Sequence, residues 1–152
     1  MEGREDRKSN DLFYTCSLIA FIARKTKNTP CQIVNALGRE NIAKIYDLAD
    51  VYHCDSIDRV SSDFIAECSI KDGCFNNIAK CKYSVPTYWD IGKVYKRLVL
   101  MIAKNEQIDI TDALIKAYNS KASNLIEDYN SSFYYDNPQN IYSAYKELSA
   151  AS

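Results

Sequence analysis

The second half of this chain repeats the residue pattern of the first half at a constant spacing of 81 positions. The segment IYDLADVYHCDSIDRVSSDFI begins at Ile45, and the segment IEDYNSSFYYDNPQNIYSAYK begins at Ile126. Apolar residues, aspartates and an aromatic-rich bend recur without a gap. The matched pairs include Tyr14/Tyr95, Ile33/Leu114, Val34/Ile115, Ala36/Ala117, Asp47/Asp128, Asp55/Asp136, Val60/Ile141 and Phe64/Tyr145. Two unrelated helix arrays can be aligned in part, but the agreement of helix-cap aspartates as well as apolar positions favours an internal duplication.

Both halves are predicted to be helical. The chain of 152 residues holds only 4 glycines and 3 prolines, and its apolar residues recur at helical spacing rather than in alternation. A unit of about 60 residues is marginal as an independent core. We therefore expect an all-α fold, a compact multi-helix bundle built from two similar four-helix halves that bury a shared face.

The expected organisation has four parts. Residues 1–9 are predicted to be a disordered tail, 10–68 a first helical unit, 69–86 a linker with one short helical turn, and 87–149 a second helical unit packed on the first. Gly38 is predicted to end a short helix that starts at Pro30. The predicted helix N-caps are Asn10 or Asp11, Thr29, Asp55 or Ser56, Asp109 or Thr111, and Asn137.

Composition narrows the functional classes. Lysine and arginine total 19 against 20 acidic residues, so the formal net charge is −1, which argues against a general nucleic-acid binder. The chain contains no run of about 20 apolar residues, which is the length that a membrane-spanning helix needs. Because no apolar leader opens the chain, we expect a cytoplasmic protein whose six cysteines are reduced and mostly buried. No CxxC pair or glycine-rich phosphate loop is present, so we expect neither a metal site nor a cofactor.

Two aromatic–aspartate bends are the candidate partner-binding surface. The first bend comprises Tyr52, His53 and Asp55, and the second bend comprises Phe133, Tyr134, Tyr135 and Asp136. Tyrosine is favoured at protein interfaces, and this chain has 12 tyrosines, although rings at the rim of a small core would follow the same pattern.

His53 is the only histidine and is a conceivable general base. The only nearby nucleophile is the adjacent Cys54, and side chains of adjacent helical residues point in different directions. The matched position in the second half is Tyr134. We therefore expect a protein that is not an enzyme.

A basic set on one predicted helix offers an alternative surface. It comprises Lys93, Lys96, Arg97 and Lys104. Such a face could bind nucleic acid or an acidic partner, but long basic side chains also commonly flank a core helix with their stems on apolar surface.

The first-half segments LFYTCSLIAFIARKT, IVNALG and IAKIYDLADVYHCDSIDRVSSDFI resemble a family of small all-helical bacterial proteins of unknown function. The second half looks like a diverged second unit of the same kind. Members of that family are often encoded beside a putative ADP-ribosyltransferase-like protein, in an arrangement similar to a toxin–antitoxin pair. The resemblance implies a non-catalytic, antitoxin-like protein that masks a transferase-like partner. The alternative is a small helical nucleic-acid-binding regulator that uses the Lys93–Lys104 helix.

Overall fold

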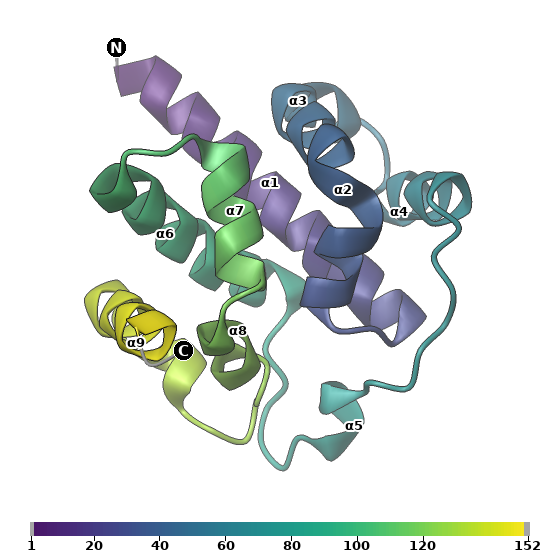
Figure 1. Ribbon diagram of the computed structural model, residues 1–152. Coiled ribbons are helices and arrows are strands. Elements are labelled where there is room, and N and C mark those ends of the chain that lie inside the picture. Colours follow the sequence, from purple (N-terminus) through teal and green to yellow (C-terminus); the bar gives the residue numbers. More distant parts are fainter. Residues whose placement is uncertain (1, 151–152) are drawn as a thin grey trace.

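The computed structural model describes residues 2–150, and this part of the chain contains helices and no strand, which confirms the predicted all-α fold. The helices are α1 (Glu2–Thr26), α2 (Pro30–Asp47), α3 (Ala49–Tyr52), α4 (Ile57–Glu67), α5 (Asn77–Lys80), α6 (Tyr88–Glu106), α7 (Ile110–Tyr118), α8 (Lys121–Ile126), the 3₁₀ turn η1 (Phe133–Tyr135) and α9 (Pro138–Ala150). Helices α1, α2, α6 and α7 pack on one another in the centre, with α4 at one side and α9 at the other (Figure 1).

Local side-chain caps fix where most of these helices begin. The Oγ1 atom of Thr87 accepts a hydrogen bond from the backbone N–H of Asp90 at 3.0 Å, and the Asp90 carboxylate accepts one from the Thr87 N–H at 2.9 Å. This reciprocal pair satisfies two backbone donors that the first turn of α6 leaves without helical partners. The N-caps predicted at Thr29, Ser56 and Asp109 are confirmed.

Helix α1 begins earlier than predicted. It starts at Glu2 rather than near Asn10, so residues 2–9, predicted to be a disordered tail, are helical; residue 1 lies outside the described residues. The reason is local. The stretch EGREDRKS contains several strong helix formers and no proline, and a polar Asn10 is tolerated inside a helix.

Gly38 ends the first arm of α2, as predicted, and a second arm follows directly across a kink. Its backbone has φ +79° and ψ 165°, which interrupts helical geometry, yet the helix resumes and runs to Asp47. A positive φ is readily adopted by glycine because it has no Cβ. The predicted short helix and its successor are therefore two arms of one kinked element.

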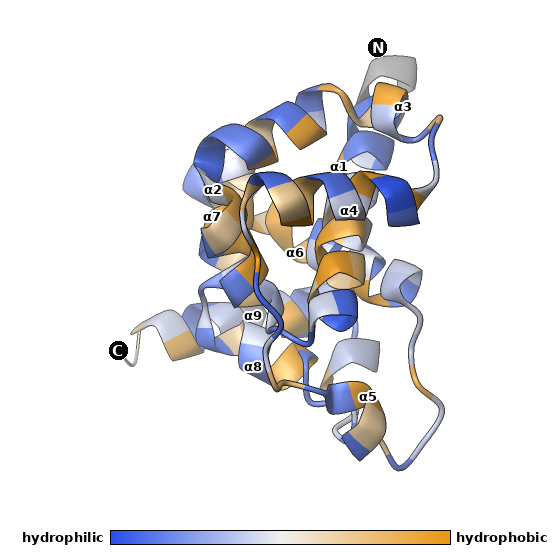
Figure 2. Ribbon diagram, turned by 90° about the vertical axis from the view of Figure 1, so that its right-hand side faces the viewer, coloured by the Kyte–Doolittle hydropathy of each residue, from blue (hydrophilic) through white to orange (hydrophobic). Residues whose placement is uncertain are grey.

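The core is centred on α1 and α6. A Cβ placed on Gly92 of α6 would lie 2.9 Å from the backbone N and Cα of Ser17 on α1, so these two helices approach as closely as only glycine allows. Beside this contact, the rings of Tyr95 and Tyr118 stack with their centroids 4.0 Å apart, which joins α6 to α7. Hydrophobic residues form bands along the helices, separated by hydrophilic ones (Figure 2), as expected of amphipathic helices around a shared core.

The order of elements recurs along the chain. Helix α6 takes the place of α1 in the second half, α7 and α8 together take the place of α2, and α9 takes the place of α4. The first residues of α4 and α9, Ile57 and Pro138, are 81 positions apart, the same spacing as in the sequence pattern. This recurrence is what a duplicated unit would produce, and the duplication itself remains a prediction.

Residues 69–86 hold the two halves together through backbone hydrogen bonds. The N–H groups of Gly73 and Phe75 donate to the carbonyl oxygens of Thr26 and Lys27 at 2.8 and 2.9 Å. From the other half, the Asn130 amide donates to the carbonyl of Lys80 at 2.9 Å. The predicted helical turn in this segment is α5.

The cysteines are less buried than predicted. All six have free thiols, but only Cys16 is buried, whereas Cys54 and Cys74 are exposed. Cys54 lies in a turn and Cys74 lies in the linker, so neither side chain is on a helix face that packs against the core. Among residues 2–150 no helix combines the length and the hydropathy needed to cross a membrane.

Candidate functional site

The two aromatic–aspartate bends lie in different parts of the molecule. The first bend follows α3, and the second surrounds η1, beside α8 and α9. Figures 1 and 2 show α3 at one end of the molecule and α8 and α9 toward the other. The structure therefore does not bring the predicted partner-binding residues into one continuous surface.

The aspartates of both bends act on their own backbone. Asp55 accepts a hydrogen bond from the backbone N–H of Ser56 at 2.8 Å, and Asp136 accepts one from that of Asn137, also at 2.8 Å. Asp136 also accepts from the Asn140 amide at 2.9 Å. Both carboxylates thus shape the turn that starts the next helix.

The second bend and part of the basic set form one groove, here called the Tyr135 groove. It is a surface hollow of about 390 Å³, and its walls include Pro86, Lys93, Val94, Arg97, Tyr134 and Tyr135. Two features that the sequence analysis treated as alternatives are neighbours in the structure. The groove offers an aromatic surface and two cations to a ligand, together with the Asp90 carboxylate, which accepts a hydrogen bond from the Thr87 N–H.

Contacts with buried rings hold the aromatic wall of this groove in place. Tyr134 is only 7% exposed and its ring contacts Tyr129 with centroids 5.8 Å apart. Tyr135 lies on Tyr134 at a centroid distance of 4.2 Å and is 69% exposed. A large ring that is positioned by the core yet open to solvent is typical of an interface anchor.

The four basic residues differ in their surroundings. Lys93 and Arg97 are exposed and face the groove, and neither takes part in an ion pair among the described residues. Lys96 instead lies 5.8 Å from the centre of the Phe13 ring, and burial, followed by the charges of Arg97 and Lys93, lowers the pKa of its ammonium group. Lys104 is exposed near the far end of α6.

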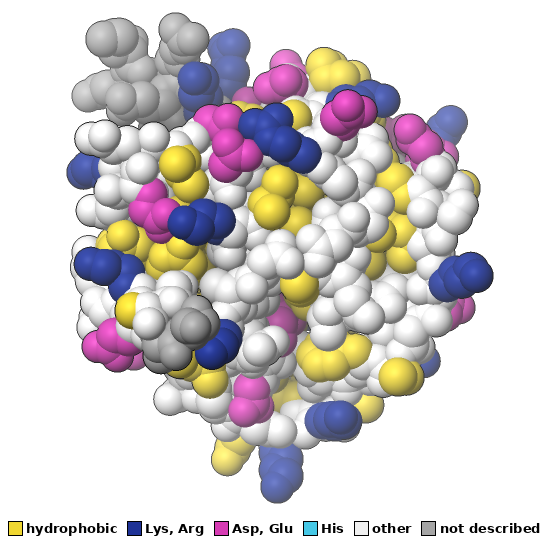
Figure 3. Space-filling view, viewed as in Figure 1, with side chains coloured by type: hydrophobic (Ala, Val, Ile, Leu, Met, Phe, Trp, Pro, Cys, Tyr) yellow, Lys and Arg dark blue, Asp and Glu magenta, His cyan; other side chains and the backbone are white. Residues whose placement is uncertain are grey.

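The charged side chains on the face seen in Figure 3 do not gather into a patch of one sign. Basic and acidic side chains are interspersed there, and hydrophobic side chains appear as separate islands. Opposite charges also pair directly elsewhere among the described residues, as Arg39 does with Asp109 and Asp112, each at 2.9 Å. On this face nothing resembles the continuous basic stripe of a nucleic-acid-binding protein.

The first bend borders a second and larger hollow, here called the His53 hollow. Its volume is about 600 Å³, and its lining includes Arg7, Asp11, Phe13, Tyr14, Asp50, His53 and Trp89. His53 is exposed and contacts the edge of the Tyr14 ring at a centroid distance of 5.7 Å. Tyr52 turns the other way and packs on Phe64 at 5.6 Å.

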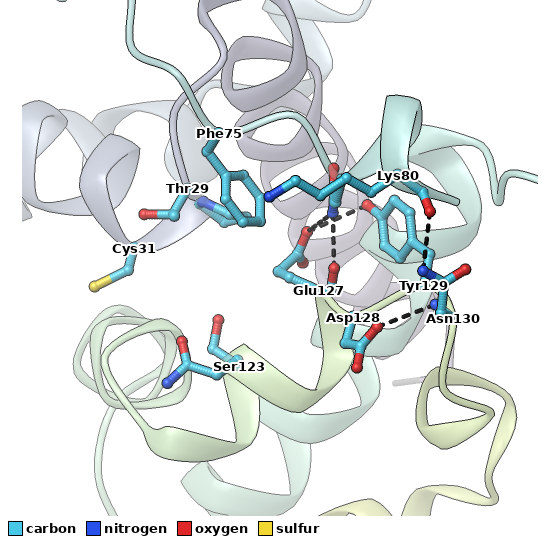
Figure 4. Close-up of a pocket in the computed structure, with 12 residues that line it drawn as sticks. Thr29, Cys31, Phe75, Lys80, Ser123, Glu127, Asp128, Tyr129 and Asn130 are labelled. Carbon is cyan, nitrogen blue, oxygen red and sulfur yellow. Dashed lines mark hydrogen bonds between the residues drawn. The ribbon is translucent and has the colours of Figure 1, made fainter. Parts of the chain in front are cut away.

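A third site, the Glu127 pocket, was not predicted from the sequence. It encloses about 290 Å³ between the start of α2, the linker and the segment after α8. Figure 4 shows Thr29 and Cys31 at the left, Ser123 below them, Glu127 near the centre, and Phe75 and Lys80 above. The pocket therefore lies where both halves and the linker meet.

Glu127 is the buried centre of a polar network at this pocket. One carboxylate oxygen accepts a hydrogen bond from the Tyr95 hydroxyl at 2.8 Å. The other accepts from the Tyr129 hydroxyl and the Asn77 amide, both at 3.2 Å. Arg24 donates to the Tyr129 oxygen at 3.0 Å. Burial raises the pKa of the Glu127 carboxyl above its ordinary value, and these donors and the Arg24 charge oppose that shift.

This network binds helices together rather than presenting a free acid. A carboxyl group with a raised pKa in a pocket is a recognised candidate for acid–base catalysis. Here both carboxylate oxygens already accept hydrogen bonds, and the thiol of Cys31 at the rim donates to Asn119 at 3.3 Å. The network therefore joins α1, α6, the linker and the end of α8.

A break in the repeat is the sequence signal that could have revealed this network. The spacing of 81 places Glu127 opposite Tyr46 and Tyr129 opposite Leu48. The buried acid and its phenol partner have therefore no counterpart in the first half, whereas Tyr95 is matched by Tyr14.

The described residues contain no group of three or more histidine, cysteine or acidic side chains that could hold a metal ion. No family model, no curated protein and no solved structure matches this chain.

Proposed function

We propose that this chain is a non-catalytic protein-binding module that docks an acidic segment of a partner protein in the Tyr135 groove. The observation that carries the proposal is the pairing of an exposed, core-supported Tyr135 ring with the unpaired cations Lys93 and Arg97. Aromatic rings and arginine are the residues that most often dominate binding energy at interfaces.

The chemistry of the groove favours carboxylates as the partner's polar groups. Lys93 and Arg97 are separated by one helical turn on α6, so their charges project on the same side. Two cations beside a ring would attract an acidic side chain and an apolar neighbour together. Asp136 adds little to such binding, because its carboxylate is engaged by Asn137 and Asn140.

The consequence for the partner would be occlusion. Docking in the Tyr135 groove would cover the partner's acidic segment and exclude the partner's substrate from it without any reaction on this chain. The resemblance of residues 11–65 supports, as part of this proposal, an antitoxin-like regulator of a transferase-like neighbour acting in the cytoplasm.

The proposal is tested by fluorescence anisotropy with short labelled probes. The probes are a glutamate-rich peptide that contains one leucine, a lysine-rich peptide of the same length and an oligothymidine of the same length. The groove variant combines Lys93→Ala, Arg97→Ala and Tyr135→Ala. The control variant combines Tyr83→Ala, Lys104→Ala and Lys121→Ala, which removes an equally exposed tyrosine and two exposed lysines outside the groove.

We expect the acidic peptide to bind the wild type and the control variant, and to bind the groove variant about tenfold more weakly. Equal binding by the groove and control variants would overturn the assignment of the surface. Tighter binding of oligothymidine, with a steep loss of affinity in salt, would favour the alternative of a nucleic-acid-binding regulator that uses the Lys93–Lys104 helix.

A further inference from the structure

We propose that the His53 hollow is a binding site for a guanidinium group, with Trp89 and Phe13 as the aromatic wall and Asp11 and Asp50 as the counter-charges. This site is separate from the Tyr135 groove, and it holds or fails independently of the proposed function. The hollow has about 600 Å³ of volume, which is within the ordinary range for small-molecule sites.

The aromatic wall is built before any ligand arrives. The rings of Phe13 and Trp89 lie with centroids 5.4 Å apart, and Tyr88 supports Trp89 from the side at 4.9 Å. Tyr88 in turn contacts Phe21 on α1 at 5.1 Å. Both Phe13 and Trp89 are partly buried and line the hollow, and the Lys96 ammonium lies 5.8 Å from the centre of the Phe13 ring. Planar cations stack well on such rings.

The acidic side of the hollow comes from two helices. Asp11 lies on α1 and Asp50 on α3, and neither carboxylate takes part in an ion pair among the described residues. Burial, followed by the charge of Asp50, raises the pKa of Asp11, and the charge of Arg7, which also lines the hollow, lowers it; the lining therefore sets two carboxylates against one guanidinium. Two carboxylates that repel each other beside aromatic rings create a place where an added cation would be stabilised.

Two further side chains complete the site. Tyr14 is 4% exposed and forms part of the lining, and its buried hydroxyl has no hydrogen-bond partner. The His53 ring contacts the Tyr14 ring edge-on, with the two centroids 5.7 Å apart. A buried hydroxyl normally finds a partner, so among the described residues this group is an unused donor or acceptor in the lining of the hollow.

A guanidinium group fits this set better than an ammonium group does. It is planar, so it can stack on Trp89, and its N–H groups lie in one plane, so they can reach two carboxylates at once. An ammonium group is a compact, strongly hydrated charge that gains less from stacking. The source of the group is either a free guanidino compound or an arginine side chain on another protein, and both present the same chemistry.

The test uses Trp89 as its own reporter, because it is the only tryptophan in the chain. Tryptophan emission is followed while agmatine, an arginine-containing peptide, the same peptide with citrulline, or the same peptide with lysine is added. Citrulline keeps the shape of arginine without its charge. The site variant is Asp11→Asn with Asp50→Asn. The control variant is Asp63→Asn with Asp72→Asn, which removes two exposed acids elsewhere.

We expect a saturable change in emission with agmatine, with the arginine peptide, or with both, and little change with citrulline or lysine. The site variant should bind about tenfold more weakly than the wild type, whereas the control variant should match the wild type. A response to agmatine assigns the site to free guanidino compounds, and a response to the arginine peptide alone assigns it to a protein side chain. Both outcomes support the proposal.

Three results would overturn it. One is the absence of a saturable response to either guanidinium probe. Another is equal binding of the citrulline peptide, and the last is an unchanged affinity in the site variant. Because the asparagine replacements keep the volume of both side chains, circular dichroism and thermal unfolding of the site variant should match the wild type and exclude misfolding as the cause of a loss.

Discussion

The close crossing of α1 and α6 makes a clear stability prediction at Gly92. Replacing a glycine inside a helix by alanine ordinarily stabilises the helix by about 1 kcal/mol. In this protein the new Cβ would lie 2.9 Å from the backbone N and Cα of Ser17, whereas ordinary contact begins at 3.4 Å. The Ser17 hydroxyl oxygen lies closer still, but the backbone contacts remain even if that side chain rotates away, so the two helices must separate.

A separation of this kind disturbs packing along the whole α1–α6 contact. Overpacking of a well-packed core costs about 1–3 kcal/mol in general, and the strain at Gly92 spans two central helices. Because the clash involves backbone, we take the upper part of this range, about 2–3 kcal/mol. Subtracting the gain of about 1 kcal/mol in helix propensity, we expect Gly92→Ala to lower the free energy of unfolding by about 1–2 kcal/mol. For a chain of this size the midpoint of thermal unfolding should fall by about 5 °C.

Urea and thermal denaturation of the wild type, Gly92→Ala, Ser17→Ala and the double variant measure this effect. The Ser17 hydroxyl is buried without a hydrogen-bond partner, so Ser17→Ala alone should cost little. In the double variant, loss of the hydroxyl should restore part of the stability, because the nearest atom to the new Cβ is then gone. An increase in stability for Gly92→Ala would refute the close crossing of the two helices.

Two further predictions concern the buried acid and a helix cap. Because burial raises the pKa of Glu127 above 4.5, the folded state binds its proton more tightly than the unfolded state, and wild-type stability should fall as pH rises through the folded-state pKa. Glu127→Gln does not titrate, so urea denaturation should show its stability rising relative to wild type over that pH range; a difference that is independent of pH would contradict the burial of a titrating carboxyl. Thr87→Ala should lower the free energy of unfolding by about 1 kcal/mol through loss of the cap of α6, while Thr87→Ser should keep it. An unchanged urea midpoint for Thr87→Ala would show that the cap contributes nothing.

Local signals in the sequence were sufficient for most of the fold. Caps such as Thr29 and Asp109, and the breaker Gly38, act through neighbouring backbone, so their positions follow from a few adjacent residues. The start of α1 was missed because no cap or proline marks it, and a charged stretch of good helix formers resembles a solvated tail.

The sites were harder to predict because they depend on which helices meet. From the sequence, the second bend and the residues Lys93 and Arg97 are two alternative surfaces. In the structure they are neighbours, because residues of η1 and α6 line the same grooves. The Glu127 pocket joins residues from α1, the linker, α6 and the end of α8, and no short motif connects them. The aspartates of the two bends were predicted to face a partner, but each engages the next residue's backbone.

The central claim is that a protein partner docks in the Tyr135 groove, and co-expression with the products of the neighbouring genes tests it most directly. The wild type, the groove variant (Lys93→Ala, Arg97→Ala, Tyr135→Ala) and the matched control variant would each be purified by an affinity tag under the same salt wash. We predict that one neighbour co-purifies at a stoichiometric level with the wild type and the control variant and is lost with the groove variant. A neighbour retained equally by the groove variant, or no co-purifying neighbour at all, would contradict the claim.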